Sequence, residues 1–121
     1  MESTRKIIAQ KLKAVQIDNY QLAEKYYKIL SNVNSLNLTE REVQLVAFAA
    51  VKGNISYANN RQEFCAKHKS SEAKIYNIIS RLKRIGILFK DGTKTKVNPL
   101  ISLNFDNDLR LEIHLTHGDV Q

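Results

Sequence analysis

Residues 70–86 constrain the fold more than any other part of this 121-residue chain. Aliphatic side chains recur there at the spacing i, i+3, i+4, i+7 and i+10, which is typical of a helix with one buried face. Ser70 or Ser71 can cap the N-terminus of this helix, and Gly86 can end it in the left-handed conformation. The buried stripe is expected to comprise Ile75, Ile78, Ile79, Leu82 and Ile85. The outer face then carries Ala73, Tyr76, Asn77, Ser80 and Arg84, flanked by Lys74, Arg81 and Lys83.

A short β-hairpin is predicted directly after this helix. Residues 87–90 and 93–97 are its two strands, and Asp91-Gly92 is the tight turn, because glycine tolerates the positive φ that such a turn demands. Pro99 ends the strand pairing, since proline has no amide hydrogen to donate.

Three helices are predicted upstream. Asp18 can cap a helix whose apolar pattern continues to Asn34. Thr39 and Glu42 form a capping box for a helix over residues 40–51, which Gly53 ends. Residues 61–68 are expected to form a short helix with its two apolar side chains, Phe64 and Cys65, facing inward. Together these elements predict a mainly α fold with a small β-hairpin, of the α+β class.

Other segments carry weaker signals. Residues 5–17 are open between a helix, which we prefer, and a strand, and residues 53–60 are expected to hold a loop or one short strand. Near the C-terminus, four aliphatic side chains alternate with polar ones and predict a half-buried strand: Leu109, Leu111, Ile113 and Leu115. The core is expected to contain Val43, Leu45 or Val46, Phe64, Ile75, Ile78, Ile79, Leu82, Ile87 and Phe89.

The positive charge is concentrated in one third of the chain. The formal charge of the whole chain is +7, and residues 61–96 alone carry ten Lys or Arg against three Asp or Glu. Residues 97–121 are acidic, with one Arg against four Asp or Glu. Clustered cations are typical of a surface that binds a polyanion, because they replace the counterions condensed on a phosphate backbone. A merely solvated surface is the alternative interpretation.

The order helix, short helix, turn, basic helix and basic hairpin resembles the winged helix-turn-helix superfamily, which includes MarR-like repressors and plasmid and phage replication or regulatory proteins. The resemblance covers about half the chain, from Leu38 to Pro99. It depends on the Ser70-Ser71 break, the run from Ile78 to Leu88 and the Asp91-Gly92 hairpin. It implies a helical extension over residues 1–37, a winged helix-turn-helix domain over 38–100, and a C-terminal strand and tail over 101–121.

This resemblance also implies binding of double-stranded DNA, as a transcriptional regulator or as a replication or packaging factor of a mobile element or phage. The basic helix would lie in the major groove and residues 61–68 would support it. Asn77 would read adenine, and Arg81 or Arg84 would read guanine or hold a phosphate. The two serines and Lys74 would contact the backbone at the start of the helix, and the hairpin lysines would contact phosphates or the minor groove. The candidate DNA-binding residues are Ser70, Ser71, Lys74, Asn77, Arg81, Arg84, Lys90, Lys94 and Lys96.

A winged-helix module that binds proteins or serves in an assembly, without DNA, is the competing hypothesis. It would favour apolar or aromatic anchors on the outer face of the basic helix, whereas that face is mostly small, polar or basic. The helix after Asp18 carries Tyr20, Tyr26 and Tyr27. It is expected either to pair two copies into a homodimer or to cover the core.

Neither catalysis nor a cofactor is supported by the sequence. Cys65 is the only cysteine, the three histidines lack zinc-site spacing, and glycine-rich phosphate loops and nucleophile motifs are missing. We therefore expect neither an enzyme nor a metal site. The longest nearly uncharged stretch, residues 43–51, is too short to cross a bilayer. The short apolar run over residues 7–9 does not resemble a signal peptide, so we expect a cytoplasmic protein.

Overall fold

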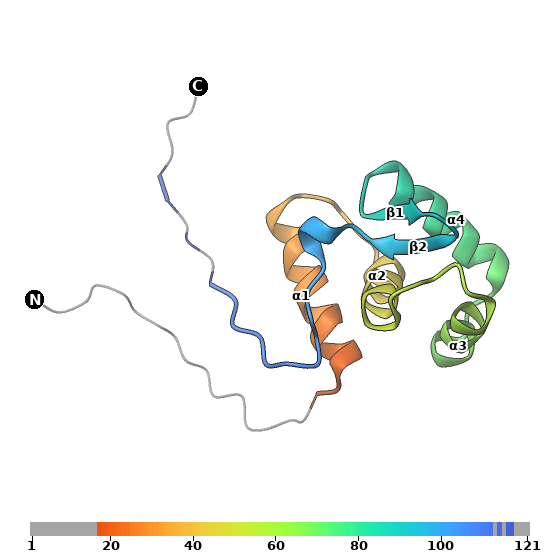
Figure 1. The fold of residues 1–121 in the computed structure, drawn as a ribbon. Coiled ribbons are helices and arrows are strands. Elements are labelled where there is room, and N and C mark those ends of the chain that lie inside the picture. Colours follow the sequence, from red (N-terminus) through yellow and green to blue (C-terminus); the bar gives the residue numbers. More distant parts are fainter. Residues whose placement is uncertain (1–16, 113, 115, 118–121) are drawn as a thin grey trace, which may run out of the picture.

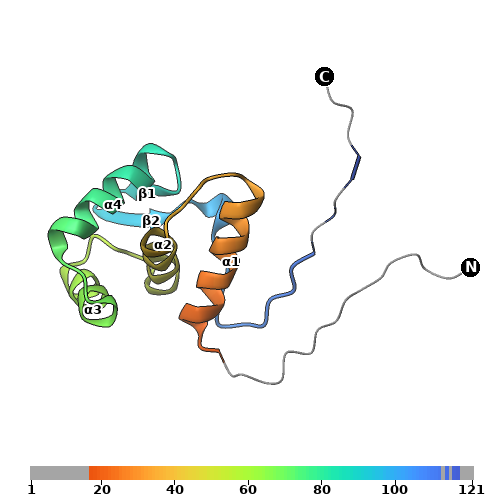
Figure 2. The ribbon, with the colours of Figure 1, turned by 180° about the vertical axis from the view of Figure 1, so that it is seen from behind.

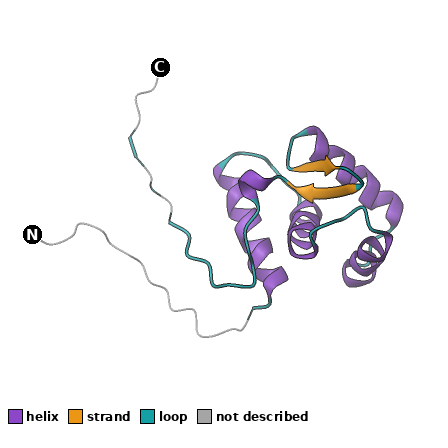
Figure 3. Ribbon diagram, in the orientation of Figure 1, coloured by secondary structure: helices purple, strands orange, loops and turns teal. Residues whose placement is uncertain are grey.

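The structure is a computed structural model that describes residues 17–112, 114, 116 and 117. Within these residues the elements are α1 (Asn19–Val33), α2 (Glu40–Lys52), α3 (Ala58–His68), α4 (Glu72–Arg84), β1 (Leu88–Asp91), β2 (Lys94–Val97) and the 3-10 turn η1 (Pro99–Ile101). Figures 1 and 2 both show α2 between α1 on one side and α3 with α4 on the other. The mainly helical content with one small antiparallel hairpin confirms the predicted α+β class (Figure 3).

The helix ends follow the signals in the sequence. Asp18, Thr39 and Ser71 each accept a hydrogen bond from a backbone N–H in the first turn of α1, α2 and α4, at 2.8, 3.2 and 3.4 Å. Gly53 and Gly86 adopt left-handed φ angles of 84° and 83° just past the ends of α2 and α4. These caps satisfy backbone groups that a helix end leaves without an intrahelical partner.

The core is built around α2, whose residues 45–49 are all fully buried. The ring of Phe48 stacks on Tyr20 of α1 and meets the ring of Phe64 of α3 edge-on, each with centroids 5.4 Å apart. Phe64 is buried as expected, and Cys65 is half-buried against the same core. A helix that is apolar on several faces needs neighbours on more than one side, which explains the central place of α2.

The tyrosines of α1 pack within the chain. Tyr27 is buried, and its hydroxyl donates a hydrogen bond to the carbonyl oxygen of Ile101 at 2.8 Å. The rings of Tyr26 and Tyr27 both lie beside Phe105, with centroid distances of 5.8 and 5.7 Å. These contacts attach α1 and the segment after η1 to one continuous core. The tyrosines considered above as dimer contacts thus pack against other residues of the same chain.

The hairpin is present, but its turn lies one residue later than predicted. Asp91 pairs with Lys94 at the closed end of the ladder, so the two connecting residues are Gly92 and Thr93. Gly92 has a φ of 62° at the first of these positions, as a type II′ turn requires. Asp91 stays in the strand, where its carboxylate lies 3.5 Å from the ammonium of Lys96.

Residues 54–56 form a loop along the outer edge of β2. The N–H of Thr95 donates to the side-chain oxygen of Asn54 at 3.0 Å, and the N–H of Ile55 donates to the carbonyl oxygen of Thr95 at 2.9 Å. The Ile55 side chain is fully buried. Of the loop and the short strand expected for residues 53–60, the structure contains the loop, up to Tyr57, and α3 begins at Ala58, earlier than expected.

The predicted C-terminal strand is wrong over residues 109–112 and 114, which form no regular element. Alternation alone is not sufficient for a strand, because a strand also needs a neighbour with which to form hydrogen bonds. Ile113, Leu115 and residues 1–16, for which a helix or strand was expected, lie outside the described residues.

The predicted core and the predicted buried stripe of α4 need three corrections at their margins. Ile78 and Phe89 are only half-buried, and Ile85 is exposed. Ile85 is the C-cap residue of α4, so it leaves the direction of the buried stripe as the helix ends.

In the part of the chain that the structure describes, no helix has the length and apolar character needed to cross a membrane.

Candidate nucleic-acid interface

The outer face of α4 is exposed from its first to its last turn. Ile75, Ile79 and Leu82 are at most 7% exposed, and their burial fixes which side chains of the helix point away from the core. The exposed set is the one predicted from the helical period: Ala73, Tyr76, Asn77, Ser80 and Arg84. This outer face presents amide, hydroxyl and guanidinium groups with small residues between them.

Five exposed cations on α4 and the hairpin make no ion pair with any other described residue. We call this set the basic surface: Lys74, Lys83 and Arg84 on α4, with Lys90 and Lys94 on the two faces of the hairpin. The hairpin follows α4 directly and β1 contacts it (Figure 1). Cations without a partner leave their charge available to bind an anion.

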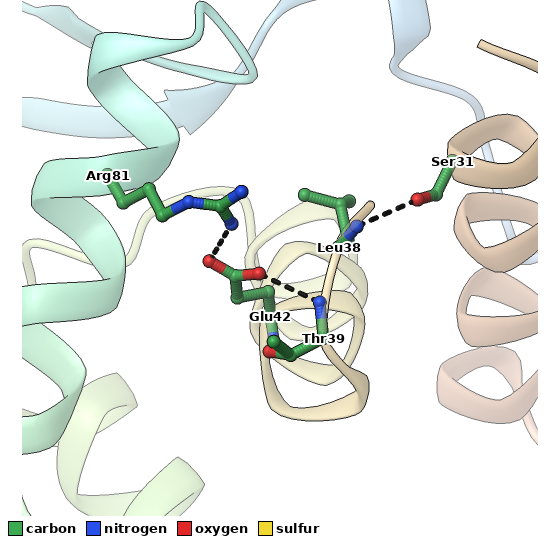
Figure 4. A network of polar contacts seen from close by, with 5 residues as sticks. All are labelled: Ser31, Leu38, Thr39, Glu42 and Arg81. Carbon is green, nitrogen blue, oxygen red and sulfur yellow. Dashed lines mark hydrogen bonds and ion pairs between the residues drawn. The ribbon is translucent and has the colours of Figure 1, made fainter. Parts of the chain in front are cut away.

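Arg81 is placed differently, because it forms an ion pair with Glu42 of α2 (Figure 4). The Glu42 side chain is only 6% exposed. One of its carboxylate oxygens accepts a hydrogen bond from Arg81, and the other accepts one from the backbone N–H of Thr39 at 2.8 Å. Arg81, predicted as a DNA contact, therefore joins α4 to α2, and its charge is paired, unlike the charges of the basic surface.

The charge state of Glu42 follows from these contacts. Burial alone would raise the pKa of its carboxyl group, but the hydrogen bonds from Arg81 and Thr39 favour the ionised form more strongly, so the pKa lies below its usual value. The adjacent Leu38 N–H donates to the hydroxyl of Ser31 of α1 at 3.1 Å (Figure 4). This polar network thus connects α4, α2 and α1 at one end of the core.

The two serines before α4 differ in accessibility. Ser71 is the exposed N-cap, and its hydroxyl oxygen accepts a hydrogen bond from the N–H of Lys74. The hydroxyl oxygen of Ser70 is buried and makes no hydrogen bond to any described residue. Ser71 and the Lys74 side chain can therefore meet a ligand at the start of α4, whereas the Ser70 hydroxyl is not on the surface.

The hairpin lysines lie on two faces. Side chains alternate between the two faces of β2. Thr95 and Val97 are buried, so Lys94 and Lys96 project from the solvent face. Lys90 pairs with Thr95 and lies on the opposite face, where it is exposed close to the turn. The structure thus brings Lys94 and Lys96 together and separates Lys90 from them.

One contact between α3 and α4 had no signal in the sequence. The guanidinium of Arg61 in α3 lies over the ring of Tyr76, with its carbon 5.2 Å from the ring centroid. Its Nε lies 3.4 Å from the carboxylate of Glu72 in the first turn of α4. Residues so far apart in sequence follow no common period, so only the packing of the two helices reveals that they meet.

A surface hollow of about 510 Å³ lies between α1 and the start of α2, away from α4 and the hairpin. Across residues 17–112, 114, 116 and 117, His, Cys, Asp and Glu side chains form no group of three that could hold a metal ion.

Comparison of the chain with protein-family models, with curated proteins and with solved structures finds no match.

Proposed function

We propose that the chain is a winged helix-turn-helix protein that binds double-stranded DNA. The basic surface is the observation that carries this proposal, because its cations are exposed and form no ion pair with the described residues. Such cations replace the counterions of a phosphate backbone and so supply affinity. In this proposal α3 and α4 are the two helices of the helix-turn-helix, and the hairpin is the wing.

The outer face of α4 suits the major groove. Asn77 carries an amide that can donate to and accept from the edge of adenine, and Arg84 can donate two hydrogen bonds to guanine or bind a phosphate. Ala73 and Ser80 are small, so they allow the groove to come close to the helix. Phosphate contacts from Lys74 and the hairpin would fix the register of α4 on the duplex.

The composition of the basic surface supports DNA over a protein partner. Four of its five cations are lysines. Lysine is depleted from the centre of protein–protein interfaces, where its charge would have to be desolvated. On a duplex the same ammonium groups lie near phosphates and remain partly hydrated, so their charge favours binding.

A titration of a fluorescent random-sequence duplex at about 50 mM and about 200 mM salt tests the proposal. We expect the affinity of the wild-type protein to fall steeply with salt. The double variant Lys74→Ala/Arg84→Ala should lower the slope of log affinity against log salt by about two units, one for each lost phosphate contact.

The matched control removes the same charge from the other side of the molecule. Lys25 and Lys28 are exposed on α1, and the variant Lys25→Ala/Lys28→Ala should keep the wild-type slope. Equal slopes for the two double variants would mean that binding depends on net charge alone. Absence of salt-sensitive affinity for any duplex would contradict the proposal.

A further inference from the structure

Tyr76 is the one large apolar group on the outer face of α4. Its side chain is 50% exposed, although exposure of an aromatic ring to water is unfavourable. It lies beside Asn77, on the edge of the outer face that borders α3. The neighbouring Ala73 and Ser80 are small and exposed.

The ring is held from α3 by Arg61. The Arg61 side chain is only 13% exposed, and its guanidinium donates a hydrogen bond to the carbonyl oxygen of Ser56. The same group contacts the Glu72 carboxylate and lies over one face of the Tyr76 ring. Because Arg61 is fixed by two other partners, the ring it supports loses little further freedom on binding a ligand.

We propose that Tyr76 is a specificity-determining residue that contacts the 5-methyl group of a thymine in the major groove. This inference rests on the proposed binding of duplex DNA. Among the features that base pairs display in the major groove, the thymine methyl is the apolar one, and it is read by apolar contact. The outer face offers two apolar groups for such a contact, the methyl group of Ala73 and the exposed ring of Tyr76, and the ring is the larger of the two.

The proposal divides the recognition of an A·T-containing site between neighbouring residues. Asn77 would supply hydrogen bonds to adenine, while Tyr76 would supply an apolar surface for the methyl of a thymine close by. The hydroxyl of Tyr76 offers a different contact, a hydrogen bond to a phosphate oxygen. A phosphate contact carries no direct sequence information, so it would be kept when a base is changed. The contact with the thymine methyl would be lost when that methyl is removed.

The test uses a duplex recovered by in vitro selection with the wild-type protein from a randomised library. Each thymine of this duplex is replaced in turn by uracil, which removes only the 5-methyl group. We expect one position at which uracil weakens binding about fourfold, the value of one buried methyl group. The variant Tyr76→Phe should keep this discrimination, and Tyr76→Ala should bind the thymine and uracil duplexes equally.

Thermal unfolding and circular dichroism of each variant ensure that folded proteins are compared. Should Tyr76→Ala unfold, the uracil series still tests the inference, because a wild-type protein that binds every uracil duplex as tightly as the thymine duplex would overturn it. Weak binding by Tyr76→Phe without any uracil effect would overturn the inference in favour of a phosphate contact. A selected site without thymine would also overturn it, with DNA binding intact. Failure of the wild-type protein to bind any duplex would instead remove the proposed function itself.

Discussion

Helices α1 and α4 are both amphipathic, yet they use their distinctive residues in opposite ways. The tyrosines of α1 turn toward the core, where Tyr20 stacks on Phe48 and Tyr27 is buried. The distinctive residues of α4 are its cations, and only Arg81 among them has an ion-pair partner within the described chain. The aliphatic stripe of α4 packs on the core, and polar contacts join Arg81 to α2 and Glu72 to α3.

The two helices therefore differ in whether contacts within the fold explain their unusual residues. The tyrosines of α1 are unusual in the sequence, but the core accounts for them. The cations of the basic surface are equally unusual, and no contact within the described residues accounts for them. Substitutions of the α1 tyrosines should therefore change stability, whereas substitutions on the outer face of α4 should change binding.

Tyr27→Ala should give the largest effect. It removes a buried ring and the hydroxyl bonded to Ile101, so we expect a loss of about 3–5 kcal/mol in the free energy of unfolding, measured by urea denaturation. Tyr27→Phe is the control and should lose about 1 kcal/mol, because only the hydrogen bond is lost. A similar small loss for both variants would show that α1 packs only loosely on the core.

Arg81→Ala and Arg84→Ala compare two arginines on one helix. Arg81→Ala leaves the buried Glu42 carboxylate without its partner and should lower the free energy of unfolding by about 1–3 kcal/mol. Arg84→Ala should change stability by less than about 0.5 kcal/mol and weaken duplex binding instead. Chemical denaturation and fluorescence anisotropy measure the two effects. Equal effects of the two substitutions on stability would contradict the separation.

The stability of the fold should also fall in acid. The pKa of Glu42 is lower in the folded than in the unfolded chain, so its stabilisation is fully present above the unfolded value and is lost as pH falls through the folded value. Thermal unfolding from about pH 7 down to about pH 3 should show this decline. Glu42→Gln, which cannot ionise, should show a shallower decline, and identical profiles would argue against the ion pair.

The smallest effect is expected for single lysines of the hairpin. Lys94→Ala removes one cation from the solvent face and should lower the salt-dependence slope of duplex binding by about one unit. Lys90→Ala removes a cation from the opposite face and should lower it less. A larger effect for Lys90 would mean that the hairpin meets DNA through its other face.

The helix ends could be predicted from the sequence because their signals are local. The Thr39–Glu42 capping box, a serine cap before α4 and the glycine after α4 act over three or four residues, and the structure contains all three, with Ser71 rather than Ser70 as the cap. The outer face of α4 could be predicted for the same reason, since the position of a side chain around one helix follows from its spacing.

Contacts between distant segments could not be predicted in this way. Arg81 and Arg84 lie close together around α4, and only the position of Glu42 in α2 decides which of them is bound. Phe105 and Ile55 are buried without any periodic context, because one lies after η1 and the other in a loop. The hairpin turn also shifted by one residue, since Asp91 can serve equally in a turn or in a strand.

The loop beside β2 has a consequence for how copies of this chain behave at high concentration. The outward N–H and carbonyl of Thr95 would make an exposed strand edge, which is a template for pairing with another molecule. Asn54 and Ile55 already occupy both groups. The β2 edge of the hairpin is thus protected at Thr95 against edge-to-edge pairing by a segment that is not itself a strand.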